Sequence, residues 1–253
     1  MFKNHPKGLL AAALSNMGER FGYYIMNAVL LLFLCSKFGL SDETSGVIYA
    51  VFYALIYVLS LIGGYIADKT QNYKATIMSG LVTMAVGYAL LSIPILATPE
   101  NTSWLLPFTC GALLLIAFGN GLFKGNLQAI VGQMYDDPKY SDKRDSGFQI
   151  FYVFINIGGL VAPFIAPLLR SWWLGVNNMT YNAGLPELCH AYINADGAMA
   201  ADQLSKFQEL AASVMQNGAP VGDLMTFSQN YLDVFNTGVH YSFFASVAAM
   251  LIS

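Results

Sequence analysis

The chain has 253 residues, of which 56% are hydrophobic and only 11% are charged, and its formal net charge is −3. A soluble domain carries roughly 25% charged residues, so this composition excludes an ordinary soluble protein. We expect no nucleic-acid partner.

Six long apolar stretches follow one another along the chain. Each reaches about the 20 residues that a helix needs to cross roughly 30 Å of hydrocarbon. They are too long and too uniformly apolar for the tilted strands of a membrane barrel. The sequence therefore predicts an all-α membrane protein with one bundle of six transmembrane helices, over residues 8–36, 44–67, 75–98, 103–133, 146–170 and 234–253.

Basic residues are distributed unevenly between the two ends of this bundle. If the N-terminus is cytoplasmic, the inner side holds more than twice as many of them as the outer side, which fits the positive-inside rule. We therefore expect a multi-pass protein of the inner (cytoplasmic) membrane with both ends of the chain inside. The first stretch shows no convincing signal-peptide cleavage site and is expected to remain as a helix. The inner set is Lys3, Lys7, Lys69, Lys74, Lys139, Lys143 and Arg144, and the outer set is Lys37, Arg170 and Lys206.

A long outer connection within the same domain covers residues 171–233. It contains apolar residues three to four positions apart, which predict an amphipathic helix ending near Gly218. These residues are Leu204, Phe207, Ala211 and Val214. Two interpretations stay open for this helix, a lid over an outer opening and a solvated spacer.

Three charged side chains interrupt the apolar stretches. Glu19 and Arg20 lie in the first stretch and Lys124 lies in the fourth. Each costs about 2.5–3.5 kcal/mol at the bilayer centre on insertion scales, so function is the default reason for keeping it. One hypothesis is that Glu19 pairs with Lys124 and locks two helices together. One acid cannot neutralise two bases, however, so an acid from elsewhere or a substrate anion is expected in a polar cavity near the midplane.

A polar stripe in the first predicted helix accompanies these charges. Asn16, Arg20, Tyr23 and Asn27 follow at spacings of four, three and four, so they share one helix face with Glu19 at its edge. Such a stripe must face a cavity or another helix, because lipid offers its polar groups no partner.

Signals of other chemistry are weak. The three cysteines are isolated, so no disulfide framework, zinc site or thiol catalysis is expected. The G-x-G of residues 119–121 lacks the strand that precedes a dinucleotide-binding loop, and no metalloprotease, nucleophile-elbow or phosphate-loop motif occurs. We expect neither an enzyme nor a bound metal or cofactor.

Four stretches carry a resemblance to a known family. They are ERFGYY at 19–24, GGYIADKTQNYKATI at 63–77, GNGLFKGN at 119–126 and FYVFINIGGL at 151–160. They resemble four motifs of the proton-dependent oligopeptide transporters (POT family, major facilitator superfamily), and they occur in the same order and on the corresponding helices. These motifs are ExxERFxYY, the signature between helices two and three, GxGLxKPN and FYxxINxGSL. The resemblance implies the N-terminal six-helix half of a larger transporter, with a C-terminal six-helix bundle as its partner.

The resemblance also implies roles for individual residues. Glu19, Arg20 and Lys124 would form the proton-coupling network, and Lys124 would also meet the carboxylate of a small peptide. Asp68 would help to close the inner side. The implied peptide-binding residues are Tyr23, Asn27, Tyr57, Lys124, Tyr152 and Asn156.

Some positions depart from the family pattern. Asn16 stands where the family has a glutamate and Asn27 where an arginine is common, so the stripe loses one acid and one base. Gly125 replaces the usual proline, and Asn72 replaces the usual glycine. Because Asn16 cannot carry a proton near neutral pH, Glu19 is the titratable acid that remains in the first helix.

Three functions follow from these patterns. The first is proton-coupled symport of di- and tripeptides or peptide-like solutes across the membrane. The second is carriage of another nitrogenous solute with weak or no proton coupling, which the departures at Asn16 and Asn27 favour. The third is a non-transporting membrane receptor or scaffold. The amides Asn16 and Asn27 favour it because they replace ionisable residues, whereas Glu19, Arg20 and Lys124 argue against it because a scaffold gains little from keeping costly buried charges.

Overall fold

A computed structural model describes residues 4–253, so the predicted inner-side Lys3 lies outside the described residues. Six helices are long and apolar enough to cross a membrane, as predicted. They are α1 (Gly8–Phe38), α2 (Asp42–Thr70), α3 (Tyr73–Leu91), α4 (Thr102–Gln133), α5 (Arg144–Val176) and α8 (Leu224–Ile252). Two shorter helices, α6 (Leu185–Asn194) and α7 (Ala201–Val214), and two 3-10 turns, η1 (Ser141–Lys143) and η2 (Gln216–Gly218), complete the described part of the chain.

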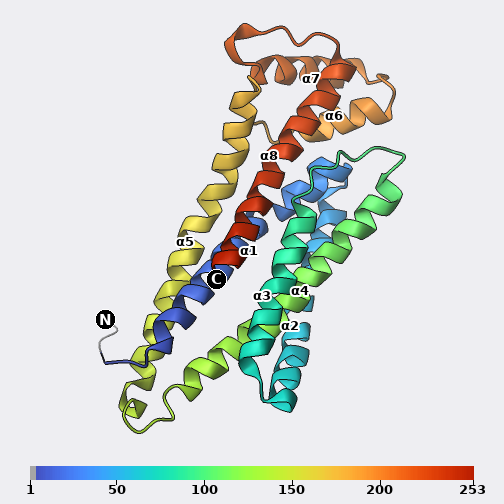
Figure 1. Cartoon of the computed structure of the whole chain (residues 1–253). Coiled ribbons are helices and arrows are strands. Elements are labelled where there is room, and N and C mark those ends of the chain that lie inside the picture. Colours follow the sequence, from blue (N-terminus) through green and yellow to red (C-terminus); the bar gives the residue numbers. More distant parts are fainter. Residues whose placement is uncertain (1–3) are drawn as a thin grey trace.

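The long helices pack as two groups of three (Figure 1). Helix α4 packs against α2 and α3, α1 packs against α5 and α8, and contacts between α3 and α8 join the groups. In the most apolar windows of α2 and α5 only 17% of residues are buried, against at least 44% in the other four helices. Helices α2 and α5 therefore leave one broad face each uncovered by the rest of the bundle.

Glycines set the closest helix crossings. A Cβ atom at Gly63 of α2 would lie 2.6 Å from the carbonyl carbon of Gly121 in α4, and one at Gly80 of α3 would lie 2.7 Å from the carbonyl oxygen of Gly119. Asn126 adds a polar link at the first crossing, because its Nδ2 donates to the Gly63 carbonyl at 3.0 Å. Small residues that let backbones approach are typical of helix packing in membranes.

Three helix boundaries differ from the prediction by six residues or more, and one of them is the end of α5, which continues past residue 170 to Val176. Helix α3 ends at Leu91, before residue 98, because Pro94 disfavours helical backbone at the residue before it. Helix α8 begins at Leu224, ten residues before the predicted start at 234. Its N-cap is Asp223, whose carboxylate accepts from the Thr226 amide at 2.9 Å, so the exposed Asp233 is an ordinary residue inside the helix.

The connection of residues 171–233 folds back onto one end of the bundle. Helix α7 occupies the stretch in which an amphipathic helix is expected, and it buries Phe207, Ala211 and Val214. Helix α6, which the sequence reading did not predict, packs against α8 and reaches α1, where His190 Nε2 lies 2.7 Å from the carbonyl oxygen of Ser36. Both short helices lie across the end of the bundle opposite the N-terminus (Figure 1).

Candidate functional site

A buried ion pair lies in the middle of α1. Glu19 is fully buried and Arg20 is 8% exposed. Arg20 donates from Nε to Oε2 of Glu19 at 2.5 Å and from Nη2 to Oε1 at 2.7 Å. The planar guanidinium therefore donates to both carboxylate oxygens, and this bidentate geometry is the strongest for such a pair.

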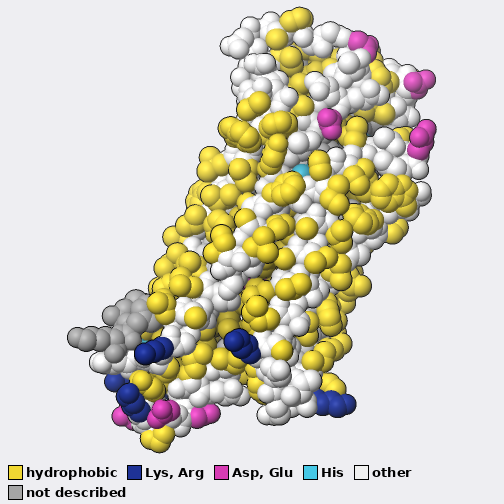
Figure 2. Space-filling view, viewed as in Figure 1, with side chains coloured by type: hydrophobic (Ala, Val, Ile, Leu, Met, Phe, Trp, Pro, Cys, Tyr) yellow, Lys and Arg dark blue, Asp and Glu magenta, His cyan; other side chains and the backbone are white. Residues whose placement is uncertain are grey.

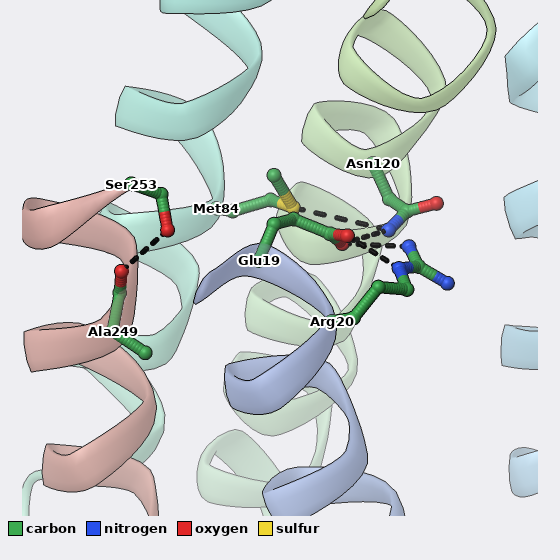
Figure 3. Close-up of polar contacts among 6 residues, drawn as sticks. All are labelled: Glu19, Arg20, Met84, Asn120, Ala249 and Ser253. Carbon is green, nitrogen blue, oxygen red and sulfur yellow. Dashed lines mark hydrogen bonds and ion pairs between the residues drawn. The ribbon is translucent and has the colours of Figure 1, made fainter. Parts of the chain in front are cut away.

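Asn120 completes the surroundings of this carboxylate. Its Nδ2 donates to Oε1 of Glu19 at 2.6 Å, and Figure 3 shows the Glu19 carboxylate pointing toward both Arg20 and Asn120. The Asn120 Oδ1 atom is buried and has no hydrogen-bond partner in the described part of the chain. Sequence reasoning missed Asn120 as a site residue, although it stands inside the quoted GNGLFKGN stretch four positions before Lys124.

Lys124 is separate from the ion pair. Its Nζ lies 4.8 Å from the centre of the Tyr57 ring, in a cation–π contact. Among residues 4–253 the ion pair present is that of Glu19 and Arg20, so the hypothesis of a Glu19–Lys124 lock between two helices is wrong. Arg20 has a similar contact with Tyr23, at 4.9 Å from the ring centre.

A cavity of about 380 Å³ brings the two cations together between α1, α2 and α4. Its volume falls in the range of small-molecule sites. Glu19 is not among the residues that line it, although its carboxylate is bound to the lining residue Arg20. The lining residues are Arg20, Tyr23, Tyr24, Asn27, Tyr49, Tyr53, Ile56, Tyr57 and Lys124.

The predicted polar stripe of α1 faces this cavity in part. Arg20, Tyr23 and Asn27 line it, whereas the buried Asn16 does not. Across the cavity, Tyr49 donates its hydroxyl to Asn27 Oδ1 at 2.8 Å. The amide that stands in place of the family's common arginine is therefore held by a neighbouring helix.

Three tyrosines on one face of α2 form the opposite wall. Tyr49, Tyr53 and Tyr57 follow at intervals of four residues; the rings of the first two stack, and the hydroxyls of the last two lie 3.2 Å apart. Sequence reasoning named only Tyr57, and it also missed Tyr24 on α1. The four-residue spacing was a usable signal, because it places the α2 tyrosines on one side of a helix.

Tyr152 and Asn156 lie outside the cavity. Both are exposed on α5, where the Tyr152 side chain is 49% exposed, and neither is among the residues that line the cavity. The structure therefore does not bring these two residues together with Tyr57 and Lys124.

Asp68 lies at the α2–α3 turn, far along α2 from the tyrosines. It is exposed, and its Oδ1 accepts from the Tyr73 hydroxyl at 2.5 Å. The residue in left-handed conformation at this turn is Gln71, with φ 52°, whereas Asn72 caps α3 by accepting from the Ala75 amide at 3.1 Å. An asparagine replaces the usual glycine here because a cap, not a left-handed residue, is required.

In the described residues 4–253, no group of three or more His, Cys, Asp or Glu side chains lies close enough together to hold a metal ion.

Comparison with known proteins places the chain in a family. The profile described as the POT family matches residues 74–189. The dipeptide and tripeptide permease B of Aliivibrio fischeri is 36% identical over 168 residues, which cover 66% of this chain and 32% of the permease. A di-/tripeptide transporter of Lactococcus lactis subsp. cremoris is 35% identical over 171 residues, covering 65% of this chain and 32% of the transporter.

Solved structures give the same assignment. A POT family transporter in complex with 5-aminolevulinic acid superposes with a TM-score of 0.59 at 28% identity, over 88% of this chain and 43% of that one. The tetrameric transporter PepTSo2 superposes with a TM-score of 0.60 at 26% identity, over 97% of this chain and 48% of that one. The chain thus spans about a third of the length of these curated relatives. With its six apolar helices, the chain is a multi-pass membrane protein that belongs to the POT family.

Proposed function

We propose that this chain forms the N-terminal half of a proton-coupled symporter for di- and tripeptides or peptide-like solutes. The observation that carries the proposal is the cavity between α1, α2 and α4, in which two cations and five tyrosines surround a space of about 380 Å³. The remaining wall of the transport path belongs to a C-terminal six-helix bundle. Substrate is held between the two bundles as they rock about it.

The charges of the cavity suit a substrate with a free carboxylate. Glu19 neutralises Arg20, which leaves the ammonium of Lys124 without an acid within 4 Å in residues 4–253. A peptide carboxylate placed at Lys124 removes this excess charge and gains a charge-assisted hydrogen bond. The hydroxyls of Tyr23, Tyr53 and Tyr57 bind the peptide backbone, which is common to all peptides whatever their side chains.

Glu19 couples this binding to a proton. When Glu19 is protonated, it loses the negative charge that holds the two N–H groups of Arg20 at 2.5 and 2.7 Å. The guanidinium then turns further into the cavity, whose wall it already forms. Two positive charges, those of Arg20 and Lys124, attract the substrate carboxylate, so proton binding and substrate binding favour each other.

The outlying predicted residues act where the bundles meet and at the inner end. Tyr152 and Asn156 lie on the uncovered face of α5, and there they contact either substrate or the partner bundle. Asp68 and the neighbouring basic residues close the inner side. The basic side chains visible in Figure 2 gather at the end that carries the N-terminus, which supports a cytoplasmic position for this end in the inner membrane.

Uptake by lipid vesicles that contain the natural full-length protein tests this proposal. Glu19→Gln keeps the size of the side chain and removes the ionisable group, so uptake driven by a proton gradient is lost while counterflow exchange of dialanine continues. Glu43→Gln, at the exposed start of α2, is the matched control and leaves both activities unchanged.

Each other outcome points to a different function. Unchanged proton-driven uptake in Glu19→Gln removes Glu19 from the coupling step. Transport of a nitrogenous solute that dialanine does not compete with supports the second candidate, carriage of another solute, which the Tyr49-bound amide at Asn27 favours. Absence of any transport by the unmodified protein supports a receptor or scaffold.

A further inference from the structure

Another buried cation lies far from the candidate site, in the last turn of α1. Lys37 is only 4% exposed. Its Nζ lies 3.2 Å from Nε2 of His240 in α8 and 5.0 Å from the centre of the Phe33 ring. In residues 4–253 no carboxylate comes within ion-pair distance of this ammonium group. A buried ammonium without a counter-charge is costly and therefore requires an explanation.

The histidine satisfies only part of this ammonium group. His240 Nδ1 lies 2.6 Å from the carbonyl oxygen of Leu91, so Nδ1 carries the proton and Nε2 is free to accept. Nε2 can take one of the three N–H groups of Lys37. The aromatic rings of Phe33 and Phe38 favour a nearby cation but offer no hydrogen-bond acceptor in the ring plane. Two N–H groups of Lys37 therefore have no acceptor in the described part of the chain.

A cavity opens beside Lys37. It has a volume of about 590 Å³ and lies between the end of α1, the α3–α4 loop, α6 and α8. Its wall carries neutral donor groups and no acidic side chain in the described residues. The polar members are Thr98, Thr102, His190, Asn194 and Gln229.

We propose that this cavity binds a small oxyanion, with a carboxylate group as the ligand chemistry and the Lys37 ammonium as its charged partner. The anion accepts the N–H groups of Lys37 that the protein leaves free and supplies the missing negative charge. The Asn194 and Gln229 amides and the threonine hydroxyls donate to its remaining oxygen lone pairs. The ligand is either a free small anion or the carboxylate end of a peptide, because both present the same group. This site is independent of the proposed transport cavity, since the two share no lining residue.

Thermal unfolding of this chain in detergent micelles, followed by tryptophan fluorescence, tests the site with acetate as the probe. Acetamide has nearly the same shape without the charge and serves as the ligand control. An anion present at ten times its Kd raises the Tm of a chain of this length by about 3–6 °C. We expect this rise with acetate and not with acetamide in the unmodified chain.

Variants separate this site from a general salt effect. Lys37→Met removes the charge and the rise, whereas Lys206→Met, which removes an exposed lysine of α7 at the same end of the bundle, keeps it. Equal effects of acetate in all three proteins, or no effect in the unmodified chain, would overturn the proposal. A larger rise with dialanine than with acetate identifies a peptide end as the better ligand, and a larger rise with acetate than with dialanine identifies a free small carboxylate.

Histidine NMR keeps the proposal testable if Lys37→Met does not fold. The chain has three histidines, so the ¹⁵N signals of His5, His190 and His240 can be assigned individually. Acetate bound to Lys37 weakens its hydrogen bond to His240 Nε2, so the His240 signal shifts and the His5 signal, at the other end of the bundle, does not. An unmoved His240 signal at saturating acetate would refute binding at Lys37.

Discussion

The crossing of α2 and α4 at Gly63 allows a sharp test of how the bundle is held together. In Gly63→Ala the added Cβ lies 2.6 Å from the carbonyl carbon of Gly121 and 2.9 Å from Cα of Leu122, with the Gly121 oxygen closer still. Carbon atoms in contact stay about 3.5–4.0 Å apart. All three obstacles are backbone atoms, which cannot move aside by changing a rotamer. The two helices must therefore separate by about 1 Å or more.

This separation has two energetic consequences. Overpacking a close contact costs about 1–3 kcal/mol, and a backbone-to-backbone clash belongs at the upper end. The hydrogen bond from Asn126 Nδ2 to the Gly63 carbonyl, now 3.0 Å, stretches as the helices part. A loss of about 3 kcal/mol corresponds to a fall in Tm of about 6–12 °C for a chain of this length.

Gly64 provides the matched control, because it is the next residue on the same helix. A Cβ atom at Gly64 meets no atom within 4 Å. Thermal unfolding of Gly63→Ala and Gly64→Ala in the same detergent should therefore show a large fall in Tm for the first and no fall for the second. If the two variants unfold at the same temperature, close approach at Gly63 does not stabilise the bundle and the packing argument is wrong.

Two further predictions concern polar groups. Asn120→Leu removes one of the three hydrogen bonds to the buried Glu19 carboxylate and should lower the free energy of unfolding by about 1.5–3 kcal/mol. In a double-mutant cycle, the same substitution should cost less in the Glu19→Gln background. Equal costs in both backgrounds would show that Asn120 does not stabilise the Glu19 carboxylate. Burial lowers the pKa of His190 from its ordinary value of 6.5, more than its bond to the Ser36 carbonyl raises it. Below pH 6.5 the unfolded chain therefore binds this proton more tightly than the folded chain, so the free energy of unfolding is highest above pH 6.5 and declines as the pH falls below it. His190→Gln should flatten the decline in Tm between pH 7.5 and 5. An unchanged slope would show that His190 does not cause the decline.

Much of the fold follows from local patterns. Six apolar stretches of sufficient length predict six helices, because a backbone in lipid must satisfy its own hydrogen bonds. Spacings of three and four residues place Arg20, Tyr23 and Asn27 on one face of α1, and the structure finds all three in one cavity. The predicted start of α8 at residue 234 was wrong, because the charged Asp233 is tolerated inside a helix that begins at Leu224.

The partners of the buried charges depended on the tertiary structure. Periodicity gives the direction of a side chain on its own helix, but the rotation of one helix relative to another is set by packing such as that of Gly63 on Gly121. That packing gives Glu19 an amide donor from Asn120 and turns Lys124 toward Tyr57. It also brings Tyr49 to Asn27 across the cavity.

The sequence by itself therefore determined that this is a six-helix membrane bundle with a polar stripe and three charges in its apolar segments. Only the tertiary structure decided which charges meet, because a contact between helices depends on residues of both. The same reason explains why Lys37, which the sequence placed simply on the outer side, proved to be buried between α1 and α8 beside an unassigned cavity.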